Sequence, residues 1–155
     1  MKIADEISTA LADEWLPTIY SEKVRSQRTR AYAIEIPKRE NRAEIQYTLL
    51  GIELKVGRRR FACPDLATAR YLRIFARIGC RDFAVPYDIT QISGVADELE
   101  TSWQRSLLML EKRATGDVTA AARSALIKAM RDEINRTGPG DAMPLFDRPT
   151  KQRNS

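Results

Sequence analysis

The 155-residue chain has no histidine and only two cysteines, Cys63 and Cys80. The lack of histidine excludes a Ser-His-Asp triad, a Cys-His dyad and a histidine general base. The two cysteines do not form a CxxC pair, and a structural zinc ion takes about four Cys or His ligands. We therefore expect no cofactor, no metal site and no catalytic residue, and a protein that leans toward a non-enzymatic role.

Long apolar runs are also lacking, because no stretch approaches the ~20 residues that span a bilayer. The first six residues, Met1 to Glu6, include acids where a secretory signal peptide would have its apolar segment. We therefore expect a cytoplasmic protein that has no membrane partner and keeps its cysteines reduced.

Charge is plentiful, and it is distributed unevenly. The net charge is +5, but residues 1–22 hold one base and five acids, whereas residues 23–60 hold eleven bases and four acids. Such an asymmetry favours a polyanionic partner. The alternative is a solvated surface that only adds solubility.

The apolar residues of the first half change period along the chain. Ile3, Ile7, Leu11 and Trp15 recur at helical spacing, which predicts a helix over roughly 2–15. Residues 18–30 fit either a second helix or an irregular connector. The period then becomes two, which predicts strands over 32–36 and from 44 onward. The apolar phase reverses near Leu49-Leu50-Gly51, where we expect a bulge or a break.

A hairpin is predicted around Gly57-Arg58, since glycine in the first central position is typical of a type II′ turn. This turn would place Val56 opposite Arg59, Leu54 opposite Phe61, and Ile52 opposite Cys63. Opposed residues share a sheet face, and the last two of these pairs are apolar. Turn chemistry and apolar pattern therefore indicate the same register.

Helices dominate the second half. Asp65 and Gly79 are the expected N-cap and C-cap of one helix. Phe83 and Val85 indicate a short strand that ends at Pro86. Two longer helices are predicted over about 94–114 and 118–136.

The predicted fold class is α+β. We expect a small antiparallel sheet of three or four strands, with a hairpin at 52–63, packed against helices and followed by a C-terminal helical pair. Residues 1–137 are expected to form a single domain. Residues 138–155 are rich in Gly, Pro and polar residues, which predicts a flexible tail.

The basic segment supplies the main candidate site. Arginine suits bidentate phosphate contact, and Tyr20, Tyr32 and Tyr47 are interleaved and could stack on bases. We therefore predict a nucleic-acid-binding accessory protein, which could be a subunit of a nucleoprotein or DNA-processing complex. The candidate residues are Arg25, Arg28, Arg30, Lys38, Arg39, Arg42, Arg58, Arg59 and Arg60.

Two other partners remain open. The same basic face could bind an acidic protein, which would make the chain an adaptor or regulator. Exposed sheet edges could pair two copies of the chain into a homodimer. Arg70, Arg73, Arg77 and Arg81 form a helical stripe that is interpreted as the solvated side of its helix or as an extension of the basic surface.

The segment Glu53-Leu54-Lys55 resembles the E-x-K element of PD-(D/E)xK nucleases. On a strand, this spacing puts the carboxylate and the ammonium group on one face. The resemblance implies Mg²⁺ held by Glu53 and a further acid, for which Glu35 and Glu44 are candidates, with Lys55 positioning the attacking water. Pro64-Asp65 follows the E-x-K, whereas the family's PD precedes it. A divergent metal-dependent nuclease is the second alternative function.

The tail contains a further short pattern. Met143, Leu145 and Phe146 resemble the peptide with which bacterial replication and repair proteins dock on the sliding clamp, although Ala142 stands where that motif has Gln. The resemblance implies partner docking through the C-terminal tail.

Overall fold

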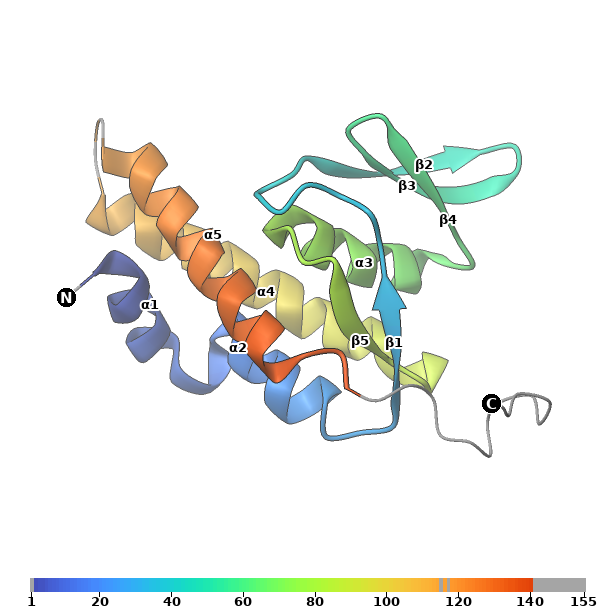
Figure 1. The fold of residues 1–155 in the computed structure, drawn as a ribbon, viewed down its shortest axis with the longest axis horizontal. Coiled ribbons are helices and arrows are strands. Elements are labelled where there is room, and N and C mark those ends of the chain that lie inside the picture. The colour runs from blue at the N-terminus through green and yellow to red at the C-terminus, as the bar shows by residue number, and fades with distance from the viewer. Residues whose placement is uncertain (1, 115, 117, 141–155) are drawn as a thin grey trace.

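The computed structural model describes residues 2–114, 116 and 118–140, and it has the predicted α+β class (Figure 1). The elements are α1 (Ile3–Leu11), a 3-10 turn (Ala12–Glu14), α2 (Leu16–Ile19), a π-helical turn (Tyr20–Val24), β1 (Thr29–Ala33), β2 (Ala43–Thr48), β3 (Gly51–Val56), β4 (Arg59–Cys63), α3 (Leu66–Ile78), β5 (Asp82–Pro86), α4 (Ile89–Arg113) and α5 (Val118–Thr137). None of the helices in these ranges is long and apolar enough to cross a membrane.

The predicted β3–β4 hairpin is confirmed residue by residue. Val56 pairs with Arg59, Leu54 with Phe61, and Ile52 with Cys63. Gly57 has φ +62°, and Arg58 is not among the residues with positive φ, as a type II′ turn requires. A two-residue turn with these dihedrals matches the twist of the flanking strands, and it therefore sets the register.

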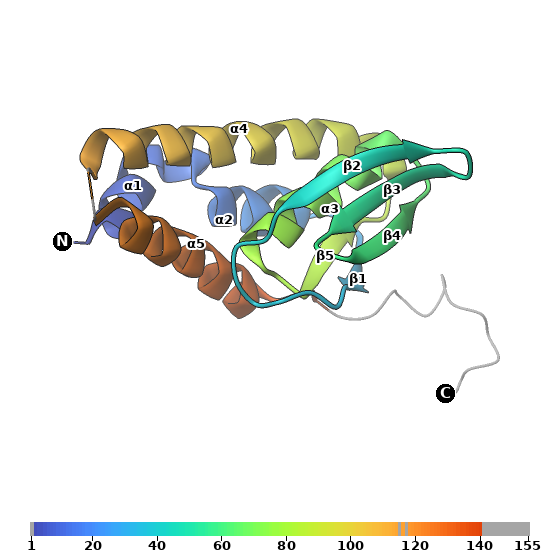
Figure 2. The same ribbon diagram turned by 90° about the horizontal axis from the view of Figure 1, so that it is seen from above.

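The apolar phase reversal near residue 50 is a break between two strands. β2 and β3 form a second hairpin in which Ile45 faces Leu54 and Tyr47 faces Ile52. Because the chain reverses between Thr48 and Gly51, the apolar residues of β2 and those of β3 lie on one face of the three-stranded sheet β2-β3-β4. This face packs against α3 (Figure 2).

The first strand belongs to a separate sheet. β1 pairs with β5 in antiparallel orientation, with Tyr32 opposite Phe83. The predicted strand over 32–36 thus begins earlier and ends at Ala33, although Ile34 and Ile36 are buried as its pattern requires. Residues 34–42 then carry the chain from the two-stranded sheet to the three-stranded one.

The N-terminal region has shorter helices than the predicted single helix over 2–15. α1 ends at Leu11 because Ala12 adopts φ +50°, outside the helical range. Pro17 lies in the first turn of α2, a position where its missing N–H costs nothing. Residues 18–30 contain the end of α2, the π-helical turn, an irregular connection and the first two residues of β1. Both predicted interpretations therefore hold in part, and neither included the strand.

The core lies around α3. Its Phe75 stacks on Phe83 of β5 at a centroid separation of 4.4 Å, and Tyr71 packs against both rings. The hydroxyl of Tyr71 donates to the Ala84 carbonyl at 2.5 Å, while the Ala84 N–H donates to the Tyr20 hydroxyl at 2.7 Å. These buried bonds satisfy the polar groups of the aromatic cluster. Figure 2 shows α4 along one side of the molecule and α5 along the other, with α1 between their ends and in contact with both.

The predicted caps of α3 are also confirmed. Asp65 accepts a hydrogen bond from the Thr68 N–H at 2.7 Å, and Gly79 ends the helix with φ +90°. α4 begins five residues before the predicted start, because Asp88 caps it by accepting from the Thr90 N–H at 3.0 Å.

Candidate nucleic-acid interface

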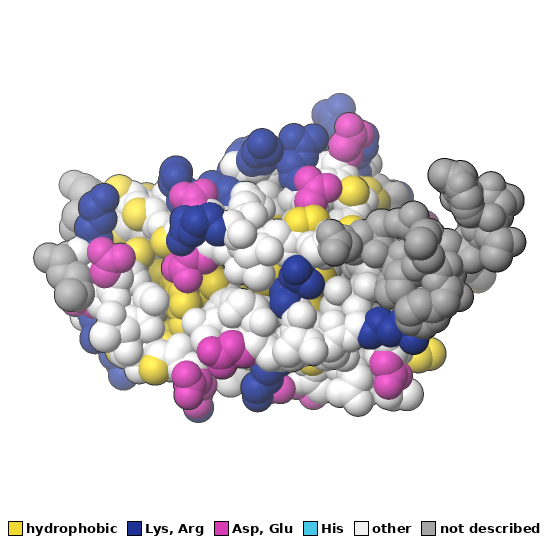
Figure 3. Space-filling view, turned by 60° about the horizontal axis from the view of Figure 1, so that its bottom comes forward, with side chains coloured by type: hydrophobic (Ala, Val, Ile, Leu, Met, Phe, Trp, Pro, Cys, Tyr) yellow, Lys and Arg dark blue, Asp and Glu magenta, His cyan; other side chains and the backbone are white. Residues whose placement is uncertain are grey.

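The fold divides the predicted basic residues among separate places. Five of them lie at the end of the three-stranded sheet where β2 begins and the β3–β4 turn lies: Lys38, Arg39, Arg42, Arg58 and Arg59. We call these five residues the basic edge. The space-filling view in Figure 3 shows Lys and Arg side chains gathered along one margin, with Asp and Glu side chains between them.

The loop of residues 37–42, which supplies three of these residues, is fixed to the C-terminal end of α3. The Asn41 side-chain amide donates to the Ala76 carbonyl at 3.0 Å, and the Asn41 N–H donates to the Arg77 carbonyl at 3.1 Å. The same amide also donates within the loop, to the Pro37 and Arg39 carbonyls at 2.9 Å each. A helix C-terminus carries partial negative charge, so it stabilises the cations of this loop.

Gly79 permits the close contact between this loop and α3. A Cβ atom at Gly79 would lie 2.4 Å from the Arg39 carbonyl oxygen and 2.6 Å from the Arg39 nitrogen. The loop's own acid, Glu40, accepts from Arg123 of α5 at 2.6 to 3.2 Å. The loop is therefore held on both sides, and its negative charge is offset by an arginine outside the basic edge.

The β3–β4 turn completes the edge. Ala43 pairs with Val56 and Val56 with Arg59, so Arg42 lies level with the Gly57-Arg58 turn. Arg59 donates to Glu35 at 2.8 Å. Both Arg42 and Arg58 are exposed, and neither has an acidic partner among the residues that the structure describes.

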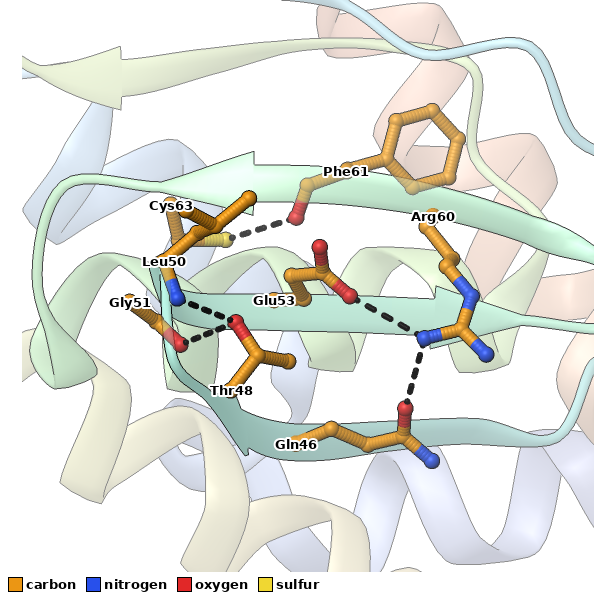
Figure 4. Close-up of polar contacts among 8 residues, drawn as sticks. All are labelled: Gln46, Thr48, Leu50, Gly51, Glu53, Arg60, Phe61 and Cys63. Atoms are coloured by element: carbon orange, nitrogen blue, oxygen red, sulfur yellow. Dashed lines mark hydrogen bonds and ion pairs between the residues drawn. The ribbon is translucent and has the colours of Figure 1, made fainter.

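Arg60 lies on the opposite face of β4 from Arg59, because side chains alternate along a strand. Its guanidinium donates to Glu53 at 3.2 Å and to Gln46 at 3.3 Å (Figure 4). The three consecutive arginines of the sequence therefore have three different surroundings, of which only that of Arg58 lacks a described acceptor.

The remaining predicted residues lie at the far end of β1. The guanidinium carbons of Arg28 and Arg30 lie 4.2 Å and 5.5 Å from the Tyr87 ring centroid. Arg25 packs against Gly140, and its Nε atom is buried without a hydrogen-bond partner in the described part of the chain. The structure separates this group from the basic edge by the length of β1 and the segment that follows it. Tyr87 was not singled out from the sequence, since only the β1–β5 pairing brings it to Arg28.

The predicted arginine stripe divides at the end of α3. Arg70, Arg73 and Arg77 lie against α4, whereas Arg81 follows the helix and lines one pocket with Lys38. Arg70 pairs with Asp97 at 2.5 Å, and Arg77 pairs with Glu100 at 3.0 Å. Arg73 lies 3.6 Å from the same Glu100 carboxylate, and burial lowers its pKa. These side chains join α3 to the acidic side of α4 and are half-buried, so they form neither a solvated face nor an extension of the basic edge.

The residues that resemble a nuclease centre are not arranged to hold a metal ion in the described part of the chain. Glu53 accepts from Arg60, and Glu35 accepts from Arg59. Lys55 shares the outer sheet face with Glu53, and the register places Glu44 directly opposite it. Among the described residues, no group of three or more His, Cys, Asp or Glu side chains is arranged to hold a metal ion.

Both cysteines are buried. Cys63 lies opposite Ile52 on the apolar face of the sheet, as the predicted hairpin register indicates. Burial raises the pKa of the Cys80 thiol to about 12 and also raises that of Cys63. Thiols with raised pKa values are weak nucleophiles at neutral pH, so the geometry favours a structural role for both.

The predicted docking residues Met143, Leu145 and Phe146 lie outside the described residues. Of the predicted tail, the structure describes Gly138, Pro139 and Gly140. The Tyr20 hydroxyl donates to the Gly138 carbonyl at 2.8 Å, so the chain beyond α5 begins in contact with the body of the fold.

The β2–β3 turn is a feature that the sequence pattern did not reveal as a site. Leu49 and Leu50 are fully exposed there, and Tyr47 beside them is 71% exposed. Their side chains fit a strand pattern as core residues. Only the turn position shows that they face solvent.

Comparison with protein-family models, with curated proteins and with solved structures found no match to the chain.

Proposed function

We propose that this protein binds nucleic acid without catalysing a reaction on it, as an accessory subunit in the cytoplasm. The observation that carries the proposal is the basic edge, in which a loop and a turn that are far apart in the sequence place five cations together. All five are exposed, and only Arg59 has an acidic partner among the described residues. Phosphate groups would supply such a partner.

The anchoring of the basic edge supports this proposal. A loop that is fixed by Asn41 and by its contact at Gly79 loses little conformational entropy when it binds. Arginine exceeds lysine four to one at the edge, and the planar guanidinium suits paired contacts to phosphate oxygens. The edge therefore presents a small, ordered array of phosphate-binding groups at one end of the sheet.

The test is fluorescence anisotropy with labelled single-stranded and double-stranded DNA and RNA at several salt concentrations. The diagnostic variant is Arg42→Glu/Arg58→Glu, which leaves the Arg59–Glu35 and Arg60–Glu53 pairs in place. The matched control is Lys2→Glu/Lys112→Glu, which changes the net charge equally. It alters the end of the molecule that holds the N-terminus and the last turn of α4 (Figure 1).

We expect micromolar or tighter binding at physiological salt that weakens steeply as salt rises, because each neutralised phosphate adds about 0.9 to the slope of log affinity against log salt. The edge variant should lose most of this affinity, and the control variant should retain it. Equal binding by both variants would contradict the assignment of the site. If the wild type binds none of the four nucleic acids, an acidic protein partner becomes the better hypothesis.

A further inference from the structure

The most exposed apolar side chains of the described chain lie together in the β2–β3 turn. Leu49 is 104% exposed, Leu50 is 96% exposed, and Tyr47 is 71% exposed. Single exposed leucines are common on protein surfaces, but adjacent exposed leucines at the end of a hairpin form a continuous apolar patch. We call these three residues the apolar tip.

Two hydrogen bonds and a glycine shape the turn that carries the apolar tip. The Thr48 hydroxyl accepts from the Leu50 N–H at 3.1 Å and donates to the Gly51 carbonyl at 3.1 Å (Figure 4). Gly51 has φ +129°, which a residue with a side chain rarely adopts. The turn thus keeps Leu49 and Leu50 extended into solvent.

The shape of the hairpin limits what it can contact. Figures 1 and 2 agree that the β2–β3 turn projects beyond α3 and away from the helices. A narrow projecting turn buries more of its apolar surface in a narrow cleft of a partner than on a flat surface. The described side chains beside it are polar or charge-balanced, since Gln46 and Glu53 both accept from Arg60.

The two ends of the three-stranded sheet carry different kinds of side chain, basic at one end and apolar at the other. The basic edge lies at one end of β3 and the apolar tip at the other, and a six-residue strand is roughly 20 Å long. Duplex DNA advances about 3.4 Å per base pair, so this length covers about six base pairs. A duplex that lies along the sheet would meet cations at one end and apolar side chains at the other.

We propose that the apolar tip inserts between two base pairs of a duplex nucleic acid and bends it, an inference that rests on the proposed function. Leucine is among the side chains that proteins use as wedges between base steps, where partial unstacking kinks the duplex. Tyr47 adds an aromatic face on which an exposed base can stack. Phosphate contacts at the basic edge would hold the duplex while the tip enters it.

The experiment uses a 30-base-pair duplex with a donor and an acceptor dye at its ends, and a second duplex with 2-aminopurine at successive steps. The diagnostic variant is Leu49→Ser/Leu50→Ser. The control is Ile89→Ser/Leu108→Ser, which removes two other exposed apolar side chains, both on α4. Sedimentation velocity of wild type and tip variant is measured in parallel.

We expect the wild type to raise energy transfer between the duplex ends and to raise 2-aminopurine emission at one or two steps. The tip variant should lose both signals and at least tenfold in duplex affinity, while its salt slope stays unchanged. The α4 control should behave as the wild type does. Only the basic-edge variant should show a smaller slope of log affinity against log salt. The two proposals therefore predict different measured changes and can be refuted separately.

Three results would overturn the inference. Salt-dependent binding without bending or 2-aminopurine signal would refute insertion and leave the proposed function intact. A wild type that binds no duplex would refute both proposals. A wild type that forms a dimer, with a tip variant that is monomeric and bends DNA normally, would show that the tip joins two copies of this chain.

Discussion

Gly79→Ala tests how the basic edge is built. Gly79 has φ +90°, and a Cβ atom there would lie 2.4 Å from the Arg39 carbonyl oxygen. Two costs follow from these values. A non-glycine residue in the left-handed region costs about 1 kcal/mol, and the loop must move because neither atom of the contact belongs to a flexible side chain.

The size of the second cost follows from the bonds that hold the loop. Displacing it would break the Asn41 N–H bond to Arg77 and the Asn41 amide bond to Ala76. Each such hydrogen bond contributes about 1 kcal/mol net. The free energy of unfolding should therefore fall by about 3 kcal/mol in total.

Urea denaturation followed by tryptophan fluorescence measures this loss. With a slope of about 2 kcal/mol per molar urea, the midpoint should fall by about 1.5 M. The control is Gly94→Ala in α4, where a Cβ atom meets nothing within 4 Å. That substitution should raise stability by about 1 kcal/mol, because alanine has the higher helix propensity. A Gly79→Ala variant within 0.5 kcal/mol of wild type would refute the tight-contact argument.

Two further predictions concern Tyr20 and Glu35. Tyr20→Phe leaves the buried Ala84 N–H without its acceptor, so the free energy of unfolding at pH 8 should fall by about 2 kcal/mol. Burial raises the pKa of Tyr20 to about 12, so the stability that its neutral hydroxyl contributes is complete below pH 10 and is lost as pH rises from 10 to 12. Urea denaturation at a series of pH values should show that the free energy of unfolding falls less steeply in this range for the variant than for the wild type. An equal fall in both proteins would contradict this. Glu35→Gln removes the partner of Arg59, so anisotropy should show tighter nucleic-acid binding with a steeper salt slope, and unchanged affinity would count against Arg59 as a ligand.

Much of the fold could be predicted because its signals are local. The Gly57-Arg58 turn determines the β3–β4 register within a few residues, and Asp65 and Gly79 cap α3 through contacts to their own helix. Periodicity indicated α4 and α5 for the same reason, since a helix repeats its buried positions within a short window.

The candidate site could be predicted only as a list of cations. Charge counting found the basic residues, but it could not show which arginines meet acids from elsewhere in the chain. Arg59 meets Glu35, 24 residues earlier, and Arg77 meets Glu100, 23 residues later. These partners decide how much positive charge remains for a ligand.

The sequence by itself determined the α+β class, the hairpin register, the caps of α3 and the burial of Cys63, because each depends on residues close together in the chain. Only the tertiary structure decided that β1 pairs with β5 and that the α3 arginines lie against α4. Those outcomes depend on which distant segments bury their apolar faces together, and a local pattern carries no information about that choice.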